Sequence, residues 1–188
     1  MSIAITDTEL EGVKLIQPRV FQDDRGWFME NWRAEHYQAA GIDFSFVQTN
    51  SSHSTVGVVR GLHYQWPMPQ GKLVWVSHGT VFDVAVDIRS DSRQFGQWVG
   101  FELSAANHAQ LWVPPGFAHG FQVLSESATF HYQCTAPYRP ECDRSIAYND
   151  PTIDVKWPLK PTGISPKDAQ ADQLLAIDAE DLPICESF

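Results

Sequence analysis

Short segments in which apolar and polar side chains alternate fill the middle of the chain, and Gly, Pro, Ser or Asn separate them. Because successive side chains of a strand point to opposite faces, this period of two is typical of β-strands. We expect strands at residues 72–77, 80–88, 100–103, 110–113, 117–124, 129–135 and 145–148. Strands this short at this spacing predict an all-β fold, a β-sandwich or small barrel, with a jelly roll as its form.

The segment from Thr80 to Ile88 shows the alternation most clearly. One face of this strand would carry Phe82, Val84, Val86 and Ile88, and the other face would carry Asp83 and Asp87 amid Val81 and Ala85. A His78-Gly79 turn separates the segment from the strand expected at 72–77, so the two strands predict a β-hairpin.

The N-terminal region predicts further short strands around turns. Residues 3–5 and 13–16 would be edge strands, and residues 20–21 and 27–30 would flank a polar turn at 23–26. A first helix is expected from Arg33 to Ala40, because Gly41 is favourable just past a helix end. Residues 44–50 should be extended and residues 51–54 should form a loop.

Prolines change the pattern after Asp150. Pro151, Pro158 and Pro161 interrupt any sheet, after which Lys167 to Ile177 predicts a short helix laid against the barrel, followed by an acidic tail. There is no internal repeat and no low-complexity linker. We therefore expect a single domain over residues 1–188, with the jelly roll at about 15–150 and a C-terminal segment at 151–188.

Composition narrows the classes of partner. The 188 residues have a formal net charge of −10 and no run rich in Lys or Arg, which argues against nucleic-acid binding; an anionic ligand would need local basic residues. No stretch of about eighteen apolar residues occurs, and residues 1–12 carry acidic side chains, so we expect neither a secreted nor a membrane-spanning protein. The three cysteines form an odd set without CxxC spacing, which fits a reducing compartment, so we expect a cytoplasmic protein.

The stretch from Val58 to Gln65 places Arg60 and His63 inside an apolar run. Burying an unpartnered polar group costs about 2–7 kcal/mol, and a charge costs more, so these side chains are either paired structurally or line a site. In a regular strand, residues three apart point to opposite faces. If both line one pocket, the strand must contain a bulge or twist, and we predict this irregularity at Gly61.

A second motif, Pro114 to His119, has the PxGxxH spacing typical of cupin-type jelly rolls. Metal-binding cupins add an HxH pair and a Glu on an earlier strand, whereas this chain has His63-Tyr64-Gln65 at that place. Glutamine is a poor transition-metal ligand, so we expect a cupin-like barrel without a metal. His63 is then weighed as an acid or base against the ordinary alternative of a core histidine.

Several motifs occur together: Arg60-Gly61-Leu62-His63-Tyr64-Gln65, Gln70-Gly71-Lys72-Leu73-Val74, the run from Val81 to Arg89, Phe95-Gly96-Gln97-Trp98, and Pro115 to Phe121. In this order they closely resemble the dTDP-4-dehydrorhamnose 3,5-epimerase family, and the likeness runs from about Leu15 to Asp172. The resemblance implies a cupin-like jelly roll, no metal or other cofactor, and a homodimer whose N-terminal strands cross into the partner's sheet. It also implies a substrate, dTDP-4-dehydro-6-deoxy-glucose, inverted at C3 and C5 on the route to dTDP-L-rhamnose.

The resemblance also assigns roles to residues. His63 would be the base, Asp168 the carboxylate that orients it, Lys72 the cation that stabilises the enolate oxygen, and Tyr132 the acid on the opposite face of the sugar. Substrate-binding roles fall on ten further positions, of which Arg25 and Glu30 would be reached from the neighbouring subunit: Arg25, Phe28, Glu30, Gln48, Asn50, Arg60, His119, Tyr138, Asp143 and Lys167. An imidazole near its usual pKa of about 6.5 and a phenol near 10 suit the base and the acid.

Taken singly, these residues have ordinary explanations. Lys72 would be a solvated lysine at a strand end, Arg25 and Glu30 a surface ion pair, and Asp83 a partner for hydrogen bonds inside the barrel. The functional alternatives are an epimerase acting at one carbon of a dTDP-deoxysugar, a metal-dependent cupin, and a sugar-binding cupin without catalysis. Trp66 to Pro69 is unusual for the family but lies outside the acid–base set. Arg139 to Cys142, beside Asp143, is also less typical, so nucleotide or sugar selectivity stays open there.

Overall fold

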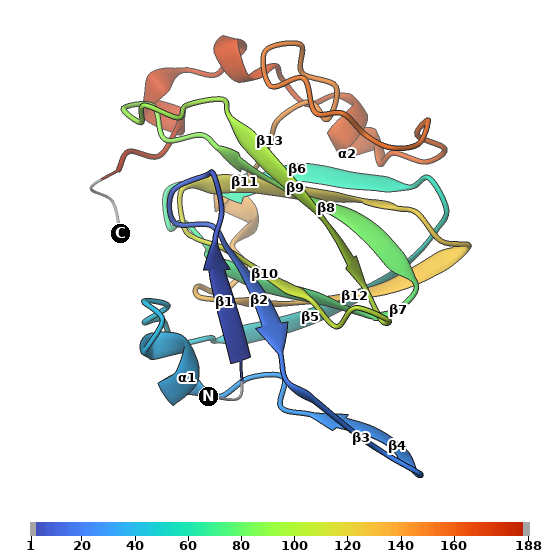
Figure 1. Ribbon diagram of the computed structural model, residues 1–188. Helices are drawn as coiled ribbons and strands as arrows, with labels where there is room; N and C mark the ends of the chain where they lie inside the picture. Colours follow the sequence, from blue (N-terminus) through green and yellow to red (C-terminus); the bar gives the residue numbers. More distant parts are fainter. Residues whose placement is uncertain (1–2, 186–188) are drawn as a thin grey trace.

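Two antiparallel β-sheets face each other in the computed structural model, which describes residues 3–185 (Figure 1). The first sheet has six strands in the spatial order β1 (Ile3–Asp7), β2 (Lys14–Pro18), β10 (Gln110–Val113), β7 (Lys72–His78), β12 (Ser127–Cys134) and β5 (Gln48–Thr55). The second has five, in the order β13 (Asp143–Ser145), β6 (Val59–Gln65), β11 (Phe117–Val123), β8 (Thr80–Asp87) and β9 (Trp98–Ser104). The predicted all-β, cupin-like jelly roll with a few short helices is confirmed.

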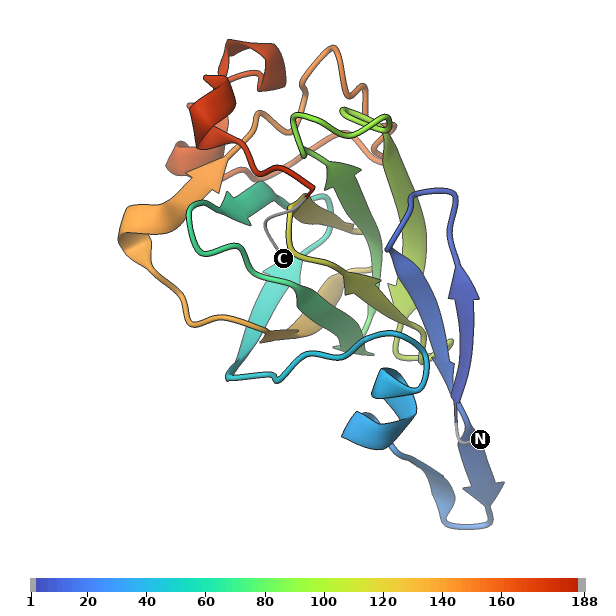
Figure 2. The same cartoon turned by 90° about the vertical axis from the view of Figure 1, so that its left-hand side faces the viewer.

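Smaller elements lie around this sandwich. The hairpin of β3 (Val20–Asp23) and β4 (Gly26–Met29) projects beyond it in both views (Figures 1 and 2). The short helix α1 (Ala34–Gln38) lies near the six-stranded sheet. In the C-terminal segment, α2 (Pro166–Ala169) and the 3-10 turns η2 (Leu174–Ala176) and η3 (Ala179–Asp181) lie over the five-stranded sheet; a further turn, η1 (Pro140–Cys142), precedes β13.

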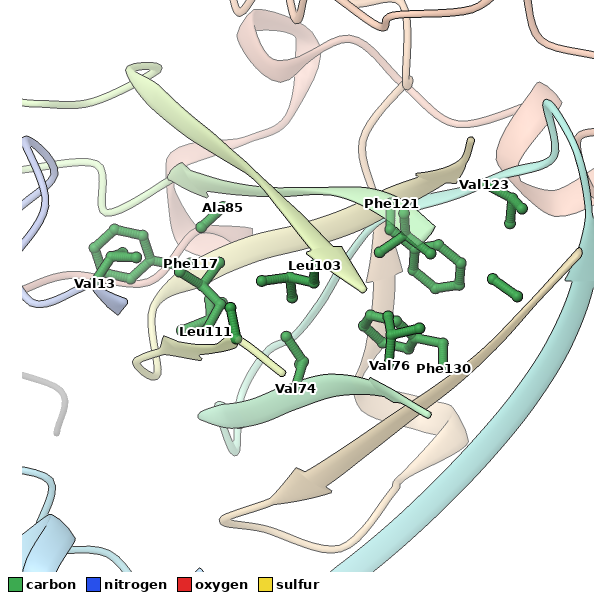
Figure 3. Close-up of a cluster of buried hydrophobic side chains, with 14 of the residues drawn as sticks. Val13, Val74, Val76, Ala85, Leu103, Leu111, Phe117, Phe121, Val123 and Phe130 are labelled. Atoms are coloured by element: carbon green, nitrogen blue, oxygen red, sulfur yellow. The ribbon is translucent and has the colours of Figure 1, made fainter. Parts of the chain in front are cut away.

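The main core fills the space between the two sheets (Figure 3). Side chains such as Val74 and Phe130 from the six-stranded sheet meet Leu103, Phe117 and Phe121 from the five-stranded sheet. A second cluster lies on the outer side of the five-stranded sheet, where the C-terminal segment covers it with Ile153, Leu174 and Leu182. Both faces of the five-stranded sheet are therefore buried, and this sheet forms the middle layer.

The predicted faces of the 80–88 strand are confirmed. Val84, Val86 and Ile88 pack outward under the C-terminal segment, while Val81 and Ala85 pack inward between the sheets. Asp83 and Asp87 share the inward face and are fully buried. Of the two expected edge strands, β1 lies at the edge, whereas β2 pairs with both β1 and β10 and is interior. The strand–turn–strand at residues 20–30 is present, and the first helix is shorter than its predicted range of 33–40.

The predicted hairpin of strands 72–77 and 80–88 is wrong. β7 lies in the six-stranded sheet between β10 and β12, whereas β8 lies in the five-stranded sheet between β11 and β9. The chain crosses from one sheet to the other at Gly79. A period of two specifies which side chains share a face, but it does not specify which strand supplies the hydrogen-bond partners.

Two other predictions are corrected. Residues 51–54 are not a loop, because β12 pairs with β5 at every position from Gln48 to Thr55. The helix expected from Lys167 to Ile177 is interrupted after Ala169. The Asp172 carbonyl accepts a hydrogen bond from the Ala147 amide at 2.9 Å, and Asp150 accepts one from the Leu174 amide at 2.6 Å. These contacts hold the chain out of a continuous helix. The strand predicted at 145–148 begins earlier, as β13 (Asp143–Ser145).

The irregularity predicted at Gly61 is confirmed. His63 lies opposite His119 and Arg60 lies opposite Phe121, so that Gly61 and Leu62 together face Gly120. Gly61 has a φ of +134°, and the Gly61–Leu62 peptide bond is cis. This bulge lets Arg60 and His63, three residues apart, line the same cavity.

The bulge makes a strong demand on residue 61. A Cβ atom there would lie 2.6 Å from Gly120 Cα and 2.9 Å from the His119 carbonyl oxygen, in a backbone conformation that favours glycine. We expect Gly61→Ala to lower the free energy of unfolding by about 3 kcal/mol, from backbone strain and overpacking together. Urea unfolding measures the change.

Gly41→Ala is the matched control for this variant. Gly41 also has a positive φ, of +83°, but a Cβ atom there would meet nothing within 4 Å. Gly41→Ala should lower the free energy of unfolding by about 1 kcal/mol, from backbone strain alone. An unfolding midpoint for Gly61→Ala as high as that of Gly41→Ala would contradict the close approach of β6 and β11.

Candidate active site

A cavity of about 640 Å³ opens between the two sheets. β5, β7 and β12 form one wall, β6 and β11 form the other, and the segment around α2 closes one side. Eleven of the residues predicted from the sequence line it: Gln48, Asn50, Arg60, His63, Lys72, His119, Tyr132, Tyr138, Asp143, Lys167 and Asp168. Gln70, Ser52 and Ser165 also line it and were not predicted.

His63 and Asp168 form a hydrogen-bonded pair on the wall of the five-stranded sheet. The His63 Nε2 atom lies 2.6 Å from Asp168 Oδ1, and the two residues are 105 positions apart in the chain. Ser165 caps α2 by accepting a hydrogen bond from the Asp168 amide at 3.1 Å, and Pro166 occupies the first helical turn. Ser at the cap followed by Pro is the usual start of a helix, and here it fixes the Asp168 carboxylate against the imidazole.

The surroundings keep Asp168 ionised. Burial alone would raise the pKa of its carboxyl, but hydrogen bonds and charge from His63, with further hydrogen bonds from Ser165 and Gly61, hold that pKa below its ordinary value. A carboxylate in this position fixes the imidazole ring and stabilises its protonated form. The pair is therefore suited to accept a proton from a bound molecule.

This pKa shift predicts a pH-dependent contribution to stability. Because the folded pKa is depressed, the Asp168 carboxylate stabilises the fold above its unfolded pKa of about 3.9, and the contribution is lost as the pH falls through the folded value. We expect Asp168→Asn to lower the free energy of unfolding at pH 7 by about 1.5–3 kcal/mol, the value of a hydrogen bond to a charged group. The difference between the two proteins should shrink toward about pH 3. Urea unfolding across this range tests it, and a constant difference would argue against an ionised Asp168.

A second imidazole–carboxylate pair lies deeper on the same wall. His119 Nε2 is 2.9 Å and 3.1 Å from the two carboxylate oxygens of Asp83, and both residues are buried. Burial lowers the pKa of the His119 imidazole against the opposing effect of Asp83, so the ring is neutral at pH 7. The sequence placed Asp83 inside the barrel but did not identify its partner.

Lys72 and Tyr132 lie on the opposite wall, in the six-stranded sheet. Tyr132 pairs in register with Asn50, while Cys134 pairs with both Lys72 and Gln48, so these polar side chains share the inner face. Burial lowers the pKa of the Lys72 amino group, against the acidic groups around it. Burial raises the pKa of the Tyr132 phenol, which therefore keeps its proton at neutral pH.

The two walls thus present opposite chemistry across the cavity. The His63 imidazole lies on the five-stranded sheet, and the Tyr132 phenol lies on the six-stranded sheet. The Lys72 amino group forms no hydrogen bond or ion pair with residues 3–185 and is available to a ligand. A flat ring held between the walls would have a base on one face and an acid on the other.

Polar and charged side chains surround the cavity entrance. Asp143 accepts a hydrogen bond from the Tyr138 hydroxyl at 3.0 Å and pairs with the Lys167 ammonium at 2.5 Å. Gln48 accepts a hydrogen bond from the Tyr138 amide at 2.8 Å. The Arg60 guanidinium donates one hydrogen bond to Ser54 and keeps further donors toward the cavity. These contacts order the mouth of the site.

Three of the predicted binding residues lie outside the cavity of this chain. Arg25 and Phe28 are on the projecting β3–β4 hairpin, where Arg25 pairs with Asp23 and the Phe28 side chain is 69% exposed. Glu30 follows the hairpin and pairs with Arg33 and His36. Their predicted contact with a neighbouring subunit's site stays a prediction.

Gln65, at the position of a cupin metal ligand, contacts the surrounding loops instead. Its amide nitrogen donates to the Met68 and Pro137 carbonyls, and its oxygen accepts from the Arg139 amide at 2.7 Å. Across residues 3–185, no three His, Cys, Asp or Glu side chains come together as metal ligands would. Within the same residues, no helix has both the length and the apolar character needed to cross a membrane.

The jelly-roll sandwich, with an imidazole–carboxylate pair and a phenol on facing walls of one cavity, is that of a cupin-like isomerase. The family model for dTDP-4-dehydrorhamnose 3,5-epimerase matches residues 7–176. The chain belongs to the dTDP-4-dehydrorhamnose 3,5-epimerase family.

Individual members of this family are similar to the chain over most of its length. A dTDP-4-dehydrorhamnose 3,5-epimerase of Pseudomonas aeruginosa is 52% identical over 167 residues, which are 88% of this chain and 92% of that protein. One of Neisseria gonorrhoeae is 52% identical over 165 residues, and there the match covers 87% of this chain but only half the length of the relative. The crystal structure of a dTDP-6-deoxy-D-glucose-3,5-epimerase from Legionella pneumophila superposes with a TM-score of 0.95 at 51% identity, covering 98% of this chain and 99% of that chain.

Proposed function

We propose that this chain converts dTDP-4-dehydro-6-deoxy-D-glucose into dTDP-4-dehydro-L-rhamnose by inverting C3 and C5, without a cofactor. The observation that carries the proposal is the placement of the His63–Asp168 pair on one wall of the cavity and Tyr132 on the other. The Legionella structure was determined in complex with dTDP-4-keto-L-rhamnose, which supports a ligand of this class.

The ketone of such a sugar explains why acid–base groups suffice. A carbonyl at C4 acidifies the C–H bonds at C3 and C5, so His63 can remove either proton and leave an enolate. The imidazolium that forms is stabilised by the Asp168 carboxylate at 2.6 Å. Lys72 stabilises the charge on the enolate oxygen, where a buried and preorganised cation is most effective.

Inversion requires the new proton to arrive from the other face. Tyr132 stands on the opposite wall from His63 and keeps its phenolic proton at neutral pH. It donates this proton to the enolate carbon. The tyrosinate then takes a proton from solvent and the His63 imidazolium releases its proton to solvent, which returns the site to its starting state. Arg60 and Lys167, near the entrance, offer positive charge to the diphosphate despite the net charge of −10.

NMR of the keto-sugar nucleotide in deuterated water tests the proposal. With this protein present, the sugar should incorporate deuterium at both C3 and C5 as the configuration inverts. Incorporation at one carbon would instead identify a single-carbon epimerase, and binding without any exchange would identify a sugar-binding module. Exchange that a chelator abolishes and a transition metal restores would identify a metal-dependent cupin.

We also infer a homodimer in which each β3–β4 hairpin reaches the partner's cavity. The hairpin exposes Phe21, Trp27 and Phe28, an apolar surface that a second subunit would cover. Mixing His63→Ala with Arg25→Ala protein tests it, because a hybrid dimer would regain one complete site. Activity above the sum of the two variants is expected, and a monomer in sedimentation would overturn the inference.

The chain's three free thiols support a reducing, cytoplasmic setting.

A further inference from the structure

Asp83 lies directly behind the cavity wall and has no contact with the cavity itself. It is 0% exposed, and both of its carboxylate oxygens approach His119 Nε2, at 2.9 Å and 3.1 Å. A carboxylate this deeply buried is costly unless it is hydrogen-bonded and balanced by charge. Its placement therefore has to be explained by what it does to His119.

The His119 ring is held on its face as well as at its edge. It stacks on Phe130, with ring centroids 5.9 Å apart and planes 24° apart, and Phe130 in turn stacks on Phe121 at 4.1 Å. With Nε2 engaged by Asp83, the other ring nitrogen, Nδ1, has no hydrogen-bond partner among residues 3–185 and is open to the cavity. The ring therefore presents one polar atom, Nδ1, to a ligand.

The charge on Asp83 decides which nitrogen carries the proton. Burial raises the pKa of the Asp83 carboxyl, and the hydrogen bonds and charge of His119, with the charge of Lys72, oppose that rise. With Asp83 ionised, both of its oxygens accept, and the nitrogen that faces them carries the proton. Burial also favours the neutral imidazole. The single N–H of that imidazole then points at the Asp83 carboxylate from Nε2, and Nδ1 carries a lone pair.

We propose that Asp83 is a positioning residue that fixes the Nε2–H form of His119, so that Nδ1 accepts a hydrogen bond from a hydroxyl of the bound hexose. The proposal rests on the proposed function, because it concerns how that site recognises the sugar. A diphosphate at neutral pH offers only acceptors and cannot pair with a bare Nδ1. His119 also lies in register opposite His63, next to the reacting part of the ligand. The Asp83–His119 pair therefore recognises the hexose and not the nucleotide.

NMR of the intact protein labelled with ¹⁵N-histidine tests the proton position directly. The His119 signals, identified by their loss in His119→Gln, should have the shifts of a protonated Nε2 and an unprotonated Nδ1, with and without dTDP. A protonated Nδ1 in either state would overturn the proposal. This measurement uses the unmodified residue 83 and does not depend on whether the chain turns over its substrate.

Asp83→Asn tests the consequence for recognition. An amide can donate as well as accept, so it no longer fixes the ring. We expect a loss of about 10–100-fold in affinity for dTDP-L-rhamnose, by analogy with the loss seen when the hydrogen-bond partner of a metal-ligating histidine is removed. Affinity for dTDP, which lacks the hexose, should be unchanged. KM for the keto-sugar should rise with kcat nearly constant, because the lost contact exists before the reaction begins.

Asp87→Asn is the matched control. Asp87 is another carboxylate of β8, also 0% exposed and on the same inward face, but it pairs with Arg89 and Ser92 away from the cavity. Asp87→Asn should lower the free energy of unfolding and leave the affinities for dTDP-L-rhamnose and dTDP unchanged. If Asp83→Asn lowers kcat alone, or weakens dTDP and dTDP-L-rhamnose equally, Asp83 is structural and the proposal fails. If the native chain catalyses no exchange, the proposed function fails, while the two affinities still decide the role of Asp83.

Discussion

His63→Ala should lower deuterium incorporation at C3 and C5 by about 10²–10⁴-fold, the contribution typical of a positioned general base. The variant removes the imidazole that pairs with Asp168. The other imidazole of the cavity, His119, is a weaker base, because burial lowers its pKa. NMR in deuterated water measures the rate at each carbon separately.

Two controls separate a lost base from a damaged fold. His53→Ala removes an exposed imidazole on the outer side of β5 that contacts Thr129, and this variant should exchange at the native rate. Added imidazole should restore part of the activity of His63→Ala, because truncation leaves room in a cavity of about 640 Å³. Exchange at the native rate in His63→Ala would require a different base and would remove the basis of the proposed mechanism.

The hydrophobic pattern was sufficient to predict the strands and their faces, but not their partners. That Asp83 and Asp87 share one face follows from the local period alone. That this face points inward depends on the C-terminal segment, which covers the other face. The assignment of β7 and β8 to different sheets depends on contacts with β10, β12, β11 and β9, which no local pattern contains. The same limit explains residues 51–54, whose strand exists because β12 pairs with it along its whole length.

Some features of the site could likewise be predicted from the sequence, and others could not. That Arg60 and His63 require a bulge at Gly61 could be argued from strand geometry, and the register shift opposite Gly120 is the result. The pairing of His63 with Asp168 joins residues 105 positions apart, and only the family resemblance pointed to it. The Asp83–His119 contact and the use of Gln65 as a loop contact arise from packing, for which neither periodicity nor motif gives a signal.

Tyr132→Phe should separate proton exchange from inversion. The variant removes one hydroxyl from the six-stranded wall and leaves the His63–Asp168 pair intact on the other. His63 can still take a proton from the sugar, and its side chain is 34% exposed, so the imidazolium can trade that proton for a deuteron from solvent. The deuteron then returns to the same face. We expect deuterium incorporation with retained configuration, while inversion falls by about 10²–10⁴-fold.

The stereochemistry of the product makes this variant more informative than a rate alone. Coupling constants in the NMR spectrum distinguish the inverted from the retained carbon, and Tyr148→Phe, a phenol outside the cavity lining, should behave as the native chain does. If Tyr132→Phe inverts both carbons at the native rate, another donor must reach the opposite face. If it loses exchange together with inversion, Tyr132 contributes to the removal of the proton, and the division of labour between the two walls is incorrect. Retained exchange with lost inversion is the outcome that an acid and a base on separate sheets require.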